Sequence, residues 1–510
     1  MLELIDALAP HGVESHVVVP EEGYVTAALQ SRDTPYVVYR YRAWTQETPL
    51  PWWDRLLKKP LAHMLRAIRL SRLIRRWRCD VIVTNTLTVC EGALAARILR
   101  LPHITYAREF GDLDHGLHFE WGPRLSVRLL RLLSTRVAFN SAALARHYRQ
   151  QVPLAQARVI YNAVSITTES LTRGEPADPR GSGAAFSCVL VGYMHPGKGH
   201  EDAIRAIANL ARRGMRVNLK LVGGVGSSDY LDRLRRLIDL LGVSGRIEIV
   251  GHVPDAGPFF READVALMCS RMEAFGRVTV EAMKLGTAVI GARSGGTSEL
   301  IRDGFNGFLY EPGDAWDLAD KIERLARDRH GAHRMGERAR RAAMEMFSLD
   351  RYGREFLDLL REVTEPRAVR AGGRRSAPSE SGRMLQPALI LVVDDDPLVR
   401  QWLAASLAAE GHDVDVASDA WTALARLEQT SYDLIVSDLR MPELDGVALY
   451  HMLERERPQV ARRMMFLTGN MAMTEYREFV AENRDRTVAK PVDVSELNRL
   501  ARRILATDAE

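Results

Sequence analysis

Cysteine is scarce in this sequence, and long apolar runs are missing from it. The four cysteines among its 510 residues are Cys79, Cys90, Cys188 and Cys269, and none of them form a C-x-x-C pair. That scatter argues against a metal site and indicates single buried thiols. No run approaches the roughly eighteen apolar residues that a membrane-spanning helix requires. The opening "MLELIDALAPHG" also has neither the basic start nor the apolar core of a signal peptide, so we expect a cytoplasmic protein.

Charge is divided unevenly along the chain. The composition, 46% hydrophobic and 27% charged, is that of a globular protein long enough for about three domains. From Ala388 to the last residue, 14 Lys and Arg face 22 Asp and Glu, a balance of −8, whereas the whole chain has a formal net charge of +4. The preceding residues therefore carry +12, and this basic body is the part that we expect to meet phosphates or an anionic surface.

Two breaks divide the chain. The segment "EVTEPRAVRAGGRRSAPSESGRMLQP", from Glu362 to Pro387, is rich in Pro, Gly, Ser and Arg, which predicts a flexible linker over residues 365–387. A second break runs from Ser165 to Phe186. The predicted parts are a first lobe, a second lobe that ends in a return helix, the linker and a tail domain: residues 1–165, 166–364, 365–387 and 388–510.

Both lobes alternate apolar β-type runs with helical patterns. Examples are "CDVIVTN" and "HITYA" in the first lobe, and "SCVLVGY" and "RIEIVGH" in the second. Strands that are apolar throughout, with helices between them, predict parallel sheets covered on both faces. We therefore expect two α/β lobes with a ligand cleft at their junction. The first lobe opens on the helix-like "LELIDALAPHG", however, where a doubly wound sheet would open on a strand and a glycine turn.

The tail domain places polar residues at the ends of successive predicted strands. Asp394 and Asp395 end the first strand, and Asp438, Thr468 and Lys490 end later ones. The carboxyl ends of parallel strands meet at one sheet edge, so we expect these side chains to converge. Magnesium binds through such carboxylates, and a carboxylate can also accept a phosphoryl group when cations neutralise the developing charge.

The motifs "VVDDDP", "VSDLRMPELDG", "LTG" and "AKP" make the tail resemble a response-regulator receiver domain, with a flavodoxin-like doubly wound fold. The resemblance implies a phosphoacceptor at Asp438, with Thr468 and Lys490 sensing the phosphoryl group. It also implies the magnesium ligands Asp394, Asp395 and Asp438, and a sensor histidine kinase or phosphotransfer protein as partner. Thr487 departs from the family, which often has an aromatic switch residue three positions before the lysine.

Two patterns in the second lobe suggest a phosphate-bearing ligand. In "VGYMHPGKGHEDAIRAIANL", Gly192 ends a strand, and Lys198 lies in a glycine turn before a helix. Amides at a helix start attract phosphate, and a lysine adds charge, although such turns are as often purely structural.

Further on, "CSRMEAFGRVTVEAMKLGTAVIGARSGGTSELI" places Glu273 in a loop and Glu281 on the short helix that follows. The two glutamates can face one cleft, where carboxylates suit sugar or ribose hydroxyls, and the amides of Phe275, Gly276 and Arg277 can meet phosphate oxygens. The alternative is that the two glutamates share no role.

Together these patterns resemble the retaining glycosyltransferases of family 4, which have two Rossmann-like lobes in the GT-B fold. The resemblance implies a UDP-, GDP- or ADP-sugar donor in the second lobe and a glycan or lipid-linked acceptor in the first, with no metal needed for transfer. Lys198 would contact the diphosphate, Glu273 the donor sugar and Glu281 the ribose. Glu273, Lys198 and His115 are the candidate catalytic residues. Tyr193 departs from the family, which usually has an arginine there, and the family's first strand and glycine loop are absent; either they lie upstream of Met1 or the first sheet lacks a strand.

Several histidines and basic side chains of the first lobe have either a functional or a purely structural role. His115 and His118 are candidates for contacts near the transferred sugar, or structural histidines. Arg108 stands where relatives carry a histidine, so no base is assigned. Nine Lys or Arg lie between Arg55 and Arg78, which predicts either a solvated helix face or peripheral docking on an anionic membrane.

Three functional hypotheses follow. The first is a glycosyltransferase regulated by phosphorylation of Asp438. The second is a signalling protein whose transferase body is inactive and serves as a partner-binding platform. The third, a transcription factor, is disfavoured because the sequence after the tail domain's last helix leaves no room for a helix-turn-helix, so we expect no nucleic-acid partner.

Overall fold

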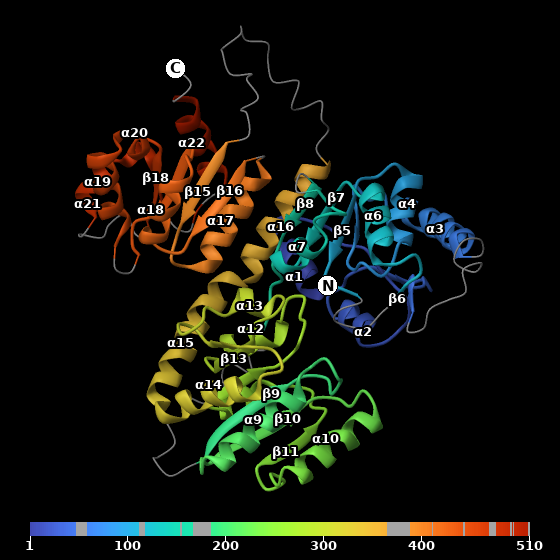
Figure 1. Ribbon diagram of the computed structural model, residues 1–510. Coiled ribbons are helices and arrows are strands. Elements are labelled where there is room, and N and C mark those ends of the chain that lie inside the picture. Colours follow the sequence, from blue (N-terminus) through green and yellow to red (C-terminus); the bar gives the residue numbers. More distant parts are fainter. Residues whose placement is uncertain are drawn as a thin grey trace. The chain divides into compact units, whose positions relative to one another are not determined.

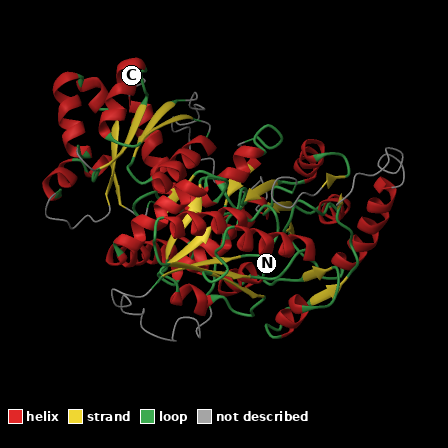
Figure 2. Cartoon of the chain, turned by 60° about the horizontal axis from the view of Figure 1, so that its bottom comes forward, coloured by secondary structure: helices red, strands yellow, loops and turns green. Residues whose placement is uncertain are grey.

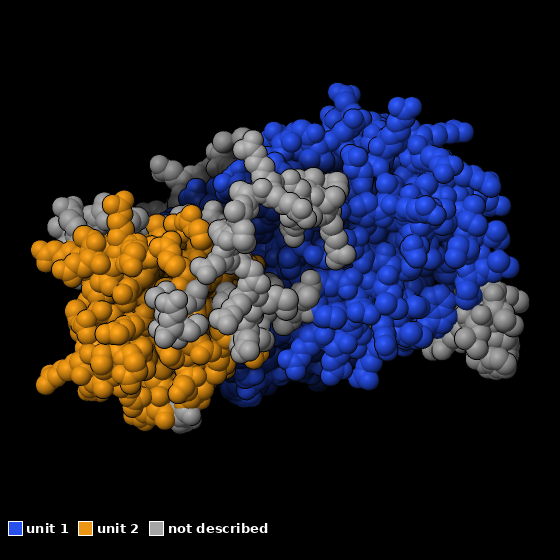
Figure 3. Space-filling view, turned by 90° about the horizontal axis from the view of Figure 1, so that it is seen from above, with its two compact units in different colours: residues 1–372 blue, residues 373–510 orange. Residues whose placement is uncertain are grey.

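The structure is a computed structural model in which the chain forms two compact units, residues 1–372 and 373–510 (Figure 1; coloured separately in Figure 3). The division falls within the predicted linker. In both units, helices cover parallel strands (Figure 2), which confirms the predicted α/β class. The structure describes residues 1–46, 59–111, 118–153, 156–166, 185–364, 388–410, 412–441, 444–468, 476–489, 492 and 494–507.

The second lobe of unit 1 is built on a six-stranded parallel sheet of order β11-β10-β9-β12-β13-β14. Its strands are β9 (Phe186–Val191), β10 (Val217–Val222), β11 (Ile247–Gly251), β12 (Val265–Met268), β13 (Ala288–Ala292) and β14 (Phe308–Tyr310). Its helices are α9 (His200–Arg212), α10 (Ser228–Leu240), α11 (Gly257–Glu262), α12 (Arg277–Lys284), α13 (Thr297–Leu300), α14 (Ala315–Arg327) and α15 (Arg329–Met346). Helices α9, α10 and α14 pack on one face of the sheet, and α11 and α12 pack on the other.

The first lobe has its strands in three separate groups. A parallel sheet of order β4-β5-β7-β8 forms its centre, β1 pairs with β2 in parallel, and β3 pairs with β6 antiparallel. The strands are β1 (Val17–Val19), β2 (Tyr36–Val38), β3 (Thr45–Gln46), β4 (Ile82–Thr84), β5 (His103–Ala107), β6 (His118–Phe119), β7 (Arg136–Phe139) and β8 (Ala157–Val159). The helices are α1 (Leu2–Leu8), η1 (Ala9–His11), α2 (Tyr24–Gln30), α3 (Lys59–Arg75), α4 (Glu91–Leu99), α6 (Pro123–Leu133) and α7 (Ala142–His147).

The β1–β2 pair and the four-stranded sheet pack against the same helices, α3 and α4. No strand of the described residues joins the two sheets. Val18 of β1 and Ile82 of β4 both lie in the apolar cluster beneath α3 and α4. On the opposite side, Val17 and Val19 pack near α1. The edges of β1 and β4 that do not face β2 and β5 therefore remain unpaired in the described structure.

Helix α16 (Leu349–Thr364) returns from the second lobe and packs against α1 of the first lobe. Two arginines of the first lobe, Arg136 and Arg158, pair with its Glu362. The buried Lys284 of α12 fixes the crossing segments, since its Nζ donates to the carbonyls of Val164 at 2.7 Å and Phe347 at 3.0 Å. Burial lowers the pKa of this amine to about 8.

Unit 2 is a five-stranded parallel sheet of order β16-β15-β17-β18-β19, flanked by helices on both faces. The strands are β15 (Leu389–Val393), β16 (Asp413–Ala417), β17 (Leu434–Asp438), β18 (Met464–Thr468) and β19 (Thr487–Ala489). The helices are α17 (Pro397–Ala409), α18 (Ala420–Gln429), α19 (Gly446–Glu456), α20 (Pro458–Ala461), α21 (Arg477–Glu482), η4 (Arg484–Arg486) and α22 (Val494–Thr507). Helices α17 and α22 pack on one face, and α18, α19 and α21 pack on the other.

The cysteines and the apolar content of the helices can be compared with the expectations from the sequence. All four cysteines are free thiols; Cys90, Cys188 and Cys269 are buried and Cys79 is half-buried. Within the described ranges, no helix combines the length and the apolar character needed to cross a bilayer.

Candidate functional site

The turn that carries Lys198 lies between β9 and α9. Gly199 begins the helix with a φ of +71°, and a Cβ there would lie 2.0 Å from the carbonyl oxygen of Cys269. Only glycine fits this position, because a side chain would have to occupy both a left-handed conformation and filled space. The amide of Arg271 donates to the carbonyl of Gly197 at 2.9 Å, which ties the lysine turn to the segment that leads to Glu273.

The structure brings Lys198 and Glu273 together. Lys198 Nζ lies 2.9 Å from Glu273 Oε2, and the two side chains are 28% and 27% exposed. The carbonyl of Glu273 accepts from the amide of Gly296 at 2.7 Å, so the "SGG" turn after β13 is hydrogen-bonded to the loop that carries Glu273. This half-exposed cation beside a carboxylate can bind an anionic group and a hydroxyl at adjacent points.

Glu281 lies on α12, as the sequence predicted, and forms an ion pair with the first residue of that helix. Nε of Arg277 lies 2.8 Å from Oε1 of Glu281, and the same guanidinium pairs with Glu3 of α1 in the first lobe. Burial raises the pKa of Glu281, although Arg277 acts in the opposite direction. No pattern in the sequence pointed to Glu3, which looks like an ordinary acidic residue in the first turn of a helix.

Phe275 and Gly276 lie directly before α12. The Phe275 ring is buried among Tyr161 and Phe347, with centroids 6.3 Å and 5.6 Å away. Gly276 has a φ of +91°, and a Cβ built on it would come within 3.6 Å of Glu273 Cγ. The Lys198–Glu273 pair and the Arg277–Glu281 pair thus adjoin the same helix start.

Tyr193, which replaces the arginine expected after Gly192, is 56% exposed. Its ring lies against the Gly224–Gly226 loop after β10, where a Cβ on Gly226 would approach the ring to 2.9 Å. An aromatic ring therefore occupies the edge of the lysine turn, in place of a guanidinium.

Glu299 is a buried connection between the lobes that sequence reasoning missed. It lies on α13, and its carboxylate accepts from the amides of Ala142 and Ala143 at the start of α7 and from the Tyr161 hydroxyl at 3.0 Å. Burial raises its pKa, and the amide and hydroxyl donors oppose that effect. The "GTSELI" motif contained this glutamate, but its partners come from the other lobe.

Of the two candidate histidines of the first lobe, His118 alone is among the described residues. His115 lies outside the described residues, and His118 is an exposed residue of β6. Arg108, to which no role was assigned, lies over the Tyr106 ring at 5.9 Å.

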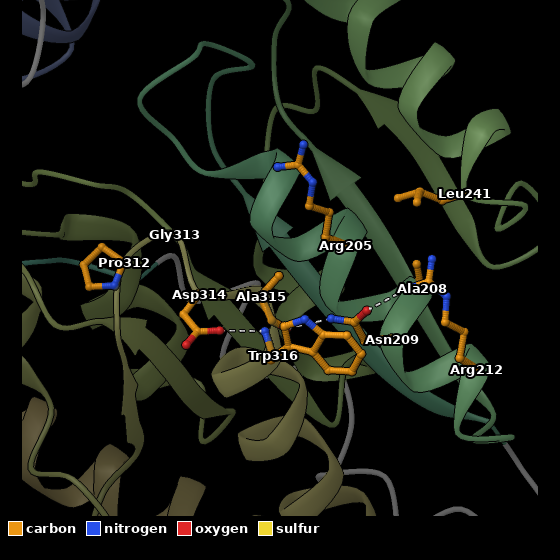
Figure 4. A pocket seen from close by; sticks show the side chains of 10 residues that line it. All are labelled: Arg205, Ala208, Asn209, Arg212, Leu241, Pro312, Gly313, Asp314, Ala315 and Trp316. Atoms are coloured by element: carbon orange, nitrogen blue, oxygen red, sulfur yellow. Dashed lines mark hydrogen bonds between the residues drawn. The ribbon is translucent and has the colours of Figure 1, made fainter.

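A separate pocket of about 620 Å³ lies in the second lobe (Figure 4). It lies between α9 and the start of α14, and none of the predicted donor-site residues line it. Arg205 and Arg212 flank it, and Trp316, 55% exposed, forms part of its wall. We therefore do not count it as part of the candidate site.

In unit 2, the predicted carboxylates do converge at the sheet edge. One oxygen each from Asp394, Asp395 and Asp438 lies within 4.8 Å of the others. Asp394 and Asp438 are buried, and the amide of Asp396 donates to Asp394 Oδ1 at 2.8 Å. This all-oxygen, carboxylate-rich set fits Mg²⁺.

Neighbouring backbone packs closely against Asp438. A Cβ on Gly446 would lie 2.1 Å from the Asp438 carbonyl oxygen, so the first residue of α19 packs directly against the backbone of Asp438. Thr468 is buried at the end of β18, and its neighbour in the sheet register is Ala489 of β19. Thr487 is also buried and donates from Oγ1 to the Asn483 carbonyl at 2.7 Å. Lys490 lies outside the described residues.

Both units match known families over most of their length. Residues 1–168 match "Glycosyltransferase Family 4" and residues 185–342 match "Glycosyl transferases group 1". Residues 390–502 match "Response regulator receiver domain". The chain belongs to the family 4 glycosyltransferases and carries a C-terminal receiver domain. Both resemblances seen in the sequence are therefore confirmed, including the GT-B fold of the glycosyltransferase unit.

Curated proteins similar to this glycosyltransferase align with part of it. Lipopolysaccharide core biosynthesis glycosyltransferase LpsE of Rhizobium meliloti is 35% identical over 163 residues, which is 32% of this chain and 46% of LpsE. D-inositol 3-phosphate glycosyltransferase of Nocardia farcinica is 35% identical over 183 residues, 33% of this chain and 40% of the relative. The chain thus spans less than half the length of these relatives.

Solved structures align with a larger share of the chain at lower identity. Anabaena HepE in complex with UDP and glucose has a TM-score of 0.56 and 24% identity, over 70% of this chain and 95% of HepE. A glycosyltransferase from Rickettsia africae has a TM-score of 0.57 and 18% identity, over 71% of this chain and 94% of its own. At these identities the similarity establishes the two-lobed fold.

Proposed function

We propose that this protein transfers a sugar, with retention at the anomeric carbon, from a nucleotide-sugar donor to a glycan or lipid-linked acceptor. The observation that carries the proposal is the Lys198–Glu273 pair, 2.9 Å apart and half-exposed, beside the start of α12. A cation and a carboxylate at that spacing suit a diphosphate and the hydroxyls of the sugar attached to it.

In this proposal each polar group has one task. Lys198 and the amides of Phe275, Gly276 and Arg277 bind the diphosphate, Glu273 faces the donor sugar, and Glu281 accepts from the ribose hydroxyls. The HepE complex holds UDP and glucose, so UDP-glucose is the first donor to test.

The reaction exchanges one bond for another. The bond from the anomeric carbon to the diphosphate oxygen breaks, and a bond from that carbon to an acceptor hydroxyl oxygen forms on the same face. The hydroxyl proton leaves with the departing diphosphate or to solvent. Lys198 stabilises the negative charge that grows on the diphosphate, and this electrostatic contribution needs no metal.

We further propose that phosphorylation of Asp438 adjusts the transfer. A bound Mg²⁺ would neutralise charge on an incoming phosphoryl group, and Asp394, Asp395 and Asp438 would hold it. The phosphoryl source is a sensor histidine kinase or a phosphotransfer protein. Thr468 and Lys490 would sense the phosphoryl group by hydrogen bond and charge.

The first lobe also offers a surface suited to an anionic membrane, where a lipid-linked acceptor would be found. Helix α3 contains no acidic residue. Its exposed apolar side chains are Leu61, Met64 and Leu65, and its exposed basic ones are Arg69, Arg72 and Arg75. Helix α6 has the same character, with Leu125 and Leu132 exposed. Apolar side chains flanked by arginines favour peripheral binding to anionic lipid.

The test uses the full chain with UDP-, GDP- and ADP-sugars, with and without acetyl phosphate. Donor binding is measured by calorimetry, and donor hydrolysis or transfer is measured by nucleotide release. We expect binding of one nucleotide class and a change in rate after phosphorylation. Absence of binding to every donor would remove the enzyme proposal.

The second candidate is a partner-binding platform without turnover. Tyr193 at the edge of the lysine turn and the divided sheet of the first lobe favour it. Donor binding without any release of nucleotide, over a range of acceptors, would support this candidate.

A further inference from the structure

Four side chains with metal-binding chemistry form a buried cluster in the first lobe, and none of them belongs to the sites described above. His63 comes from α3, Cys90 and Glu91 from the start of α4, and Glu120 from the residue after β6. Each residue is at most 3% exposed. The sequence argued against a cysteine metal site because the cysteines are scattered, but these partners come together only in the folded lobe.

The His63 imidazole stands between two carboxylates. Its Nδ1 lies 2.9 Å from Oε1 of Glu91, and its Nε2 lies 3.2 Å from Oε2 of Glu120. Moreover, one ring nitrogen of His63, Sγ of Cys90 and one oxygen of Glu91 all lie within 4.8 Å of one another. A modest inward movement of these side chains would bring all three atoms to the distances of a metal shell, about 2.0–2.3 Å from a central ion.

Glu91 shows a feature that its hydrogen bonds do not explain. Its Oε1 accepts from Nε of Arg66 at 2.8 Å. Its Oε2, although the residue is fully buried, has no hydrogen-bond partner within the part of the chain that the structure describes. A buried carboxylate oxygen without a donor is costly, and a cation at that point would remove the cost.

We propose that His63, Cys90 and Glu91 bind a zinc ion, with Glu120 supporting the imidazole at its second nitrogen. Thiolate, imidazole and carboxylate are the ligands that zinc takes in proteins, whereas calcium and magnesium prefer oxygen alone. A carboxylate that accepts from the far nitrogen of a ligating histidine fixes the ring and its tautomer. On binding, the Cys90 thiol and the coordinating nitrogen give up their protons to solvent.

In this proposal, the Arg66 guanidinium moves away from the cluster when the ion binds. Its Nη2 lies 3.0 Å from Nδ1 of His63, where the guanidinium supplies positive charge to the cluster. The Arg66 side chain is 21% exposed, so its head can turn to solvent once the metal provides that charge.

The competing explanation is an ion network of His63, Arg66, Glu91 and Glu120 without metal. Cys90 distinguishes the two, because the ion network does not need a thiol and the zinc site does. Bound zinc would also connect α3 to the start of α4, so it would raise the stability of the first lobe by linkage.

The test is titration of the full, reduced chain with cobalt(II) in an excess of Mg²⁺, which keeps cobalt from sites made only of oxygen. Cobalt bound to a thiolate absorbs strongly in the near ultraviolet, whereas cobalt bound to carboxylates does not. We expect this absorption to saturate at one cobalt per chain, to disappear when zinc is added, and to be absent from Cys90→Ser. Chelation of the zinc-loaded chain should lower its unfolding temperature.

Cys79→Ser is the matched control, since Cys79 is a half-buried thiol outside the cluster, and it should keep the full absorption. His63→Gln replaces Cys90→Ser if the latter does not fold. A folded wild-type chain without thiolate–cobalt absorption, or an undiminished signal in the cluster variants, would overturn the proposal in favour of the metal-free ion network.

Discussion

Arg277, the first residue of α12 in the second lobe, forms an ion pair with Glu3 of α1 in the first lobe. The same guanidinium lies 2.8 Å from Glu281 on its own helix. A cation at the start of the candidate donor helix is thus shared between two carboxylates, one of them from the opposite lobe. Glu3 thereby reduces the positive charge available to a diphosphate.

Replacing Glu3 should therefore strengthen nucleotide binding. We expect Glu3→Gln to lower the Kd for a nucleoside diphosphate severalfold, because Arg277 then keeps a single carboxylate partner. The free energy of unfolding should fall by about 1 kcal/mol, since the side chains of Arg277 and Glu3 are 45% and 16% exposed and ion pairs in contact with solvent contribute little. Isothermal titration calorimetry measures the first effect and urea unfolding the second.

Asp6→Asn provides the matched control, because Asp6 lies on the same helix and pairs with Arg32. It should leave nucleotide affinity unchanged. Glu281→Gln should weaken binding, because it removes the carboxylate proposed to meet the ribose. Equal affinities in Glu3→Gln and Asp6→Asn would show that Glu3 does not limit Arg277.

Lys198 should be required for transfer. Lys198→Met removes the charge opposite the departing diphosphate, and loss of one such electrostatic group costs roughly 10²–10³-fold in kcat. Steady-state nucleotide release measures the effect. Lys220→Met is the control, because Lys220 pairs with Glu262 elsewhere in the same lobe. A Lys198→Met enzyme with wild-type kcat would contradict the proposed role.

Phosphorylation should depend on Asp438. We expect acetyl phosphate to add one phosphoryl group to the wild-type chain in the presence of Mg²⁺, and to add none to Asp438→Asn or after chelation of Mg²⁺. Mass spectrometry of the intact protein measures this. Asp413→Asn, at the exposed start of β16, should behave as wild type. Full phosphorylation of the Asp438 variant would move the phosphoacceptor to another residue.

Acid should destabilise unit 1 through His103. Burial lowers the pKa of this imidazole to about 3, and the ring lies 2.8 Å from Thr84 Oγ1 and 2.9 Å from Ser134 Oγ. The unfolded chain, with the ordinary pKa of 6.5, binds a proton that the folded chain does not. The stability due to this group is therefore complete above pH 6.5 and is lost as pH falls towards 3.

The loss should amount to about 1.4 kcal/mol per pH unit below the unfolded pKa. Urea unfolding between pH 6 and pH 4 should show this slope in the wild type and a shallower one in His103→Gln. His147→Gln, which changes an exposed histidine, should keep the wild-type slope. Identical slopes in all three proteins would exclude His103 as the source.

The first lobe has two separate parallel sheets, β1–β2 and β4-β5-β7-β8. We expect an added strand that pairs with both of them to raise the unfolding temperature. A chain carrying an extra apolar strand and turn ahead of α1 could pair with the unpaired edges of β1 and β4. Each apolar side chain buried in this way contributes about 1.5–3 kcal/mol. Thermal unfolding measures the gain, with a Gly-Ser extension of equal length as control. An equal effect of both extensions would show that no strand enters between β1 and β4.

The sequence predicted much of the fold because that information is local. Apolar runs of strand length, glycine turns and helix starts appear as short patterns, and parallel order then brings strand ends such as those of Asp394 and Asp438 to one edge. The same logic placed Glu281 on a short helix and Lys198 in a turn before another.

Other features required three-dimensional neighbours. Helix α12 buries Val280, Ala282 and Met283, and the half-buried Val278 packs against the same core. The face that a short helix buries depends on what packs against it, in this case α15, which its own periodicity does not reveal.

By itself, the sequence determined the class of fold, the receiver carboxylates and the donor-lobe motifs, since each rests on residues close together in the chain or on strand ends that topology gathers. Only the tertiary structure decided that Glu3 shares Arg277, that Glu299 joins the lobes, and that His63, Cys90 and Glu91 meet in one buried place. Electrostatic contacts of this kind depend on distance in space, and packing between remote elements sets that distance.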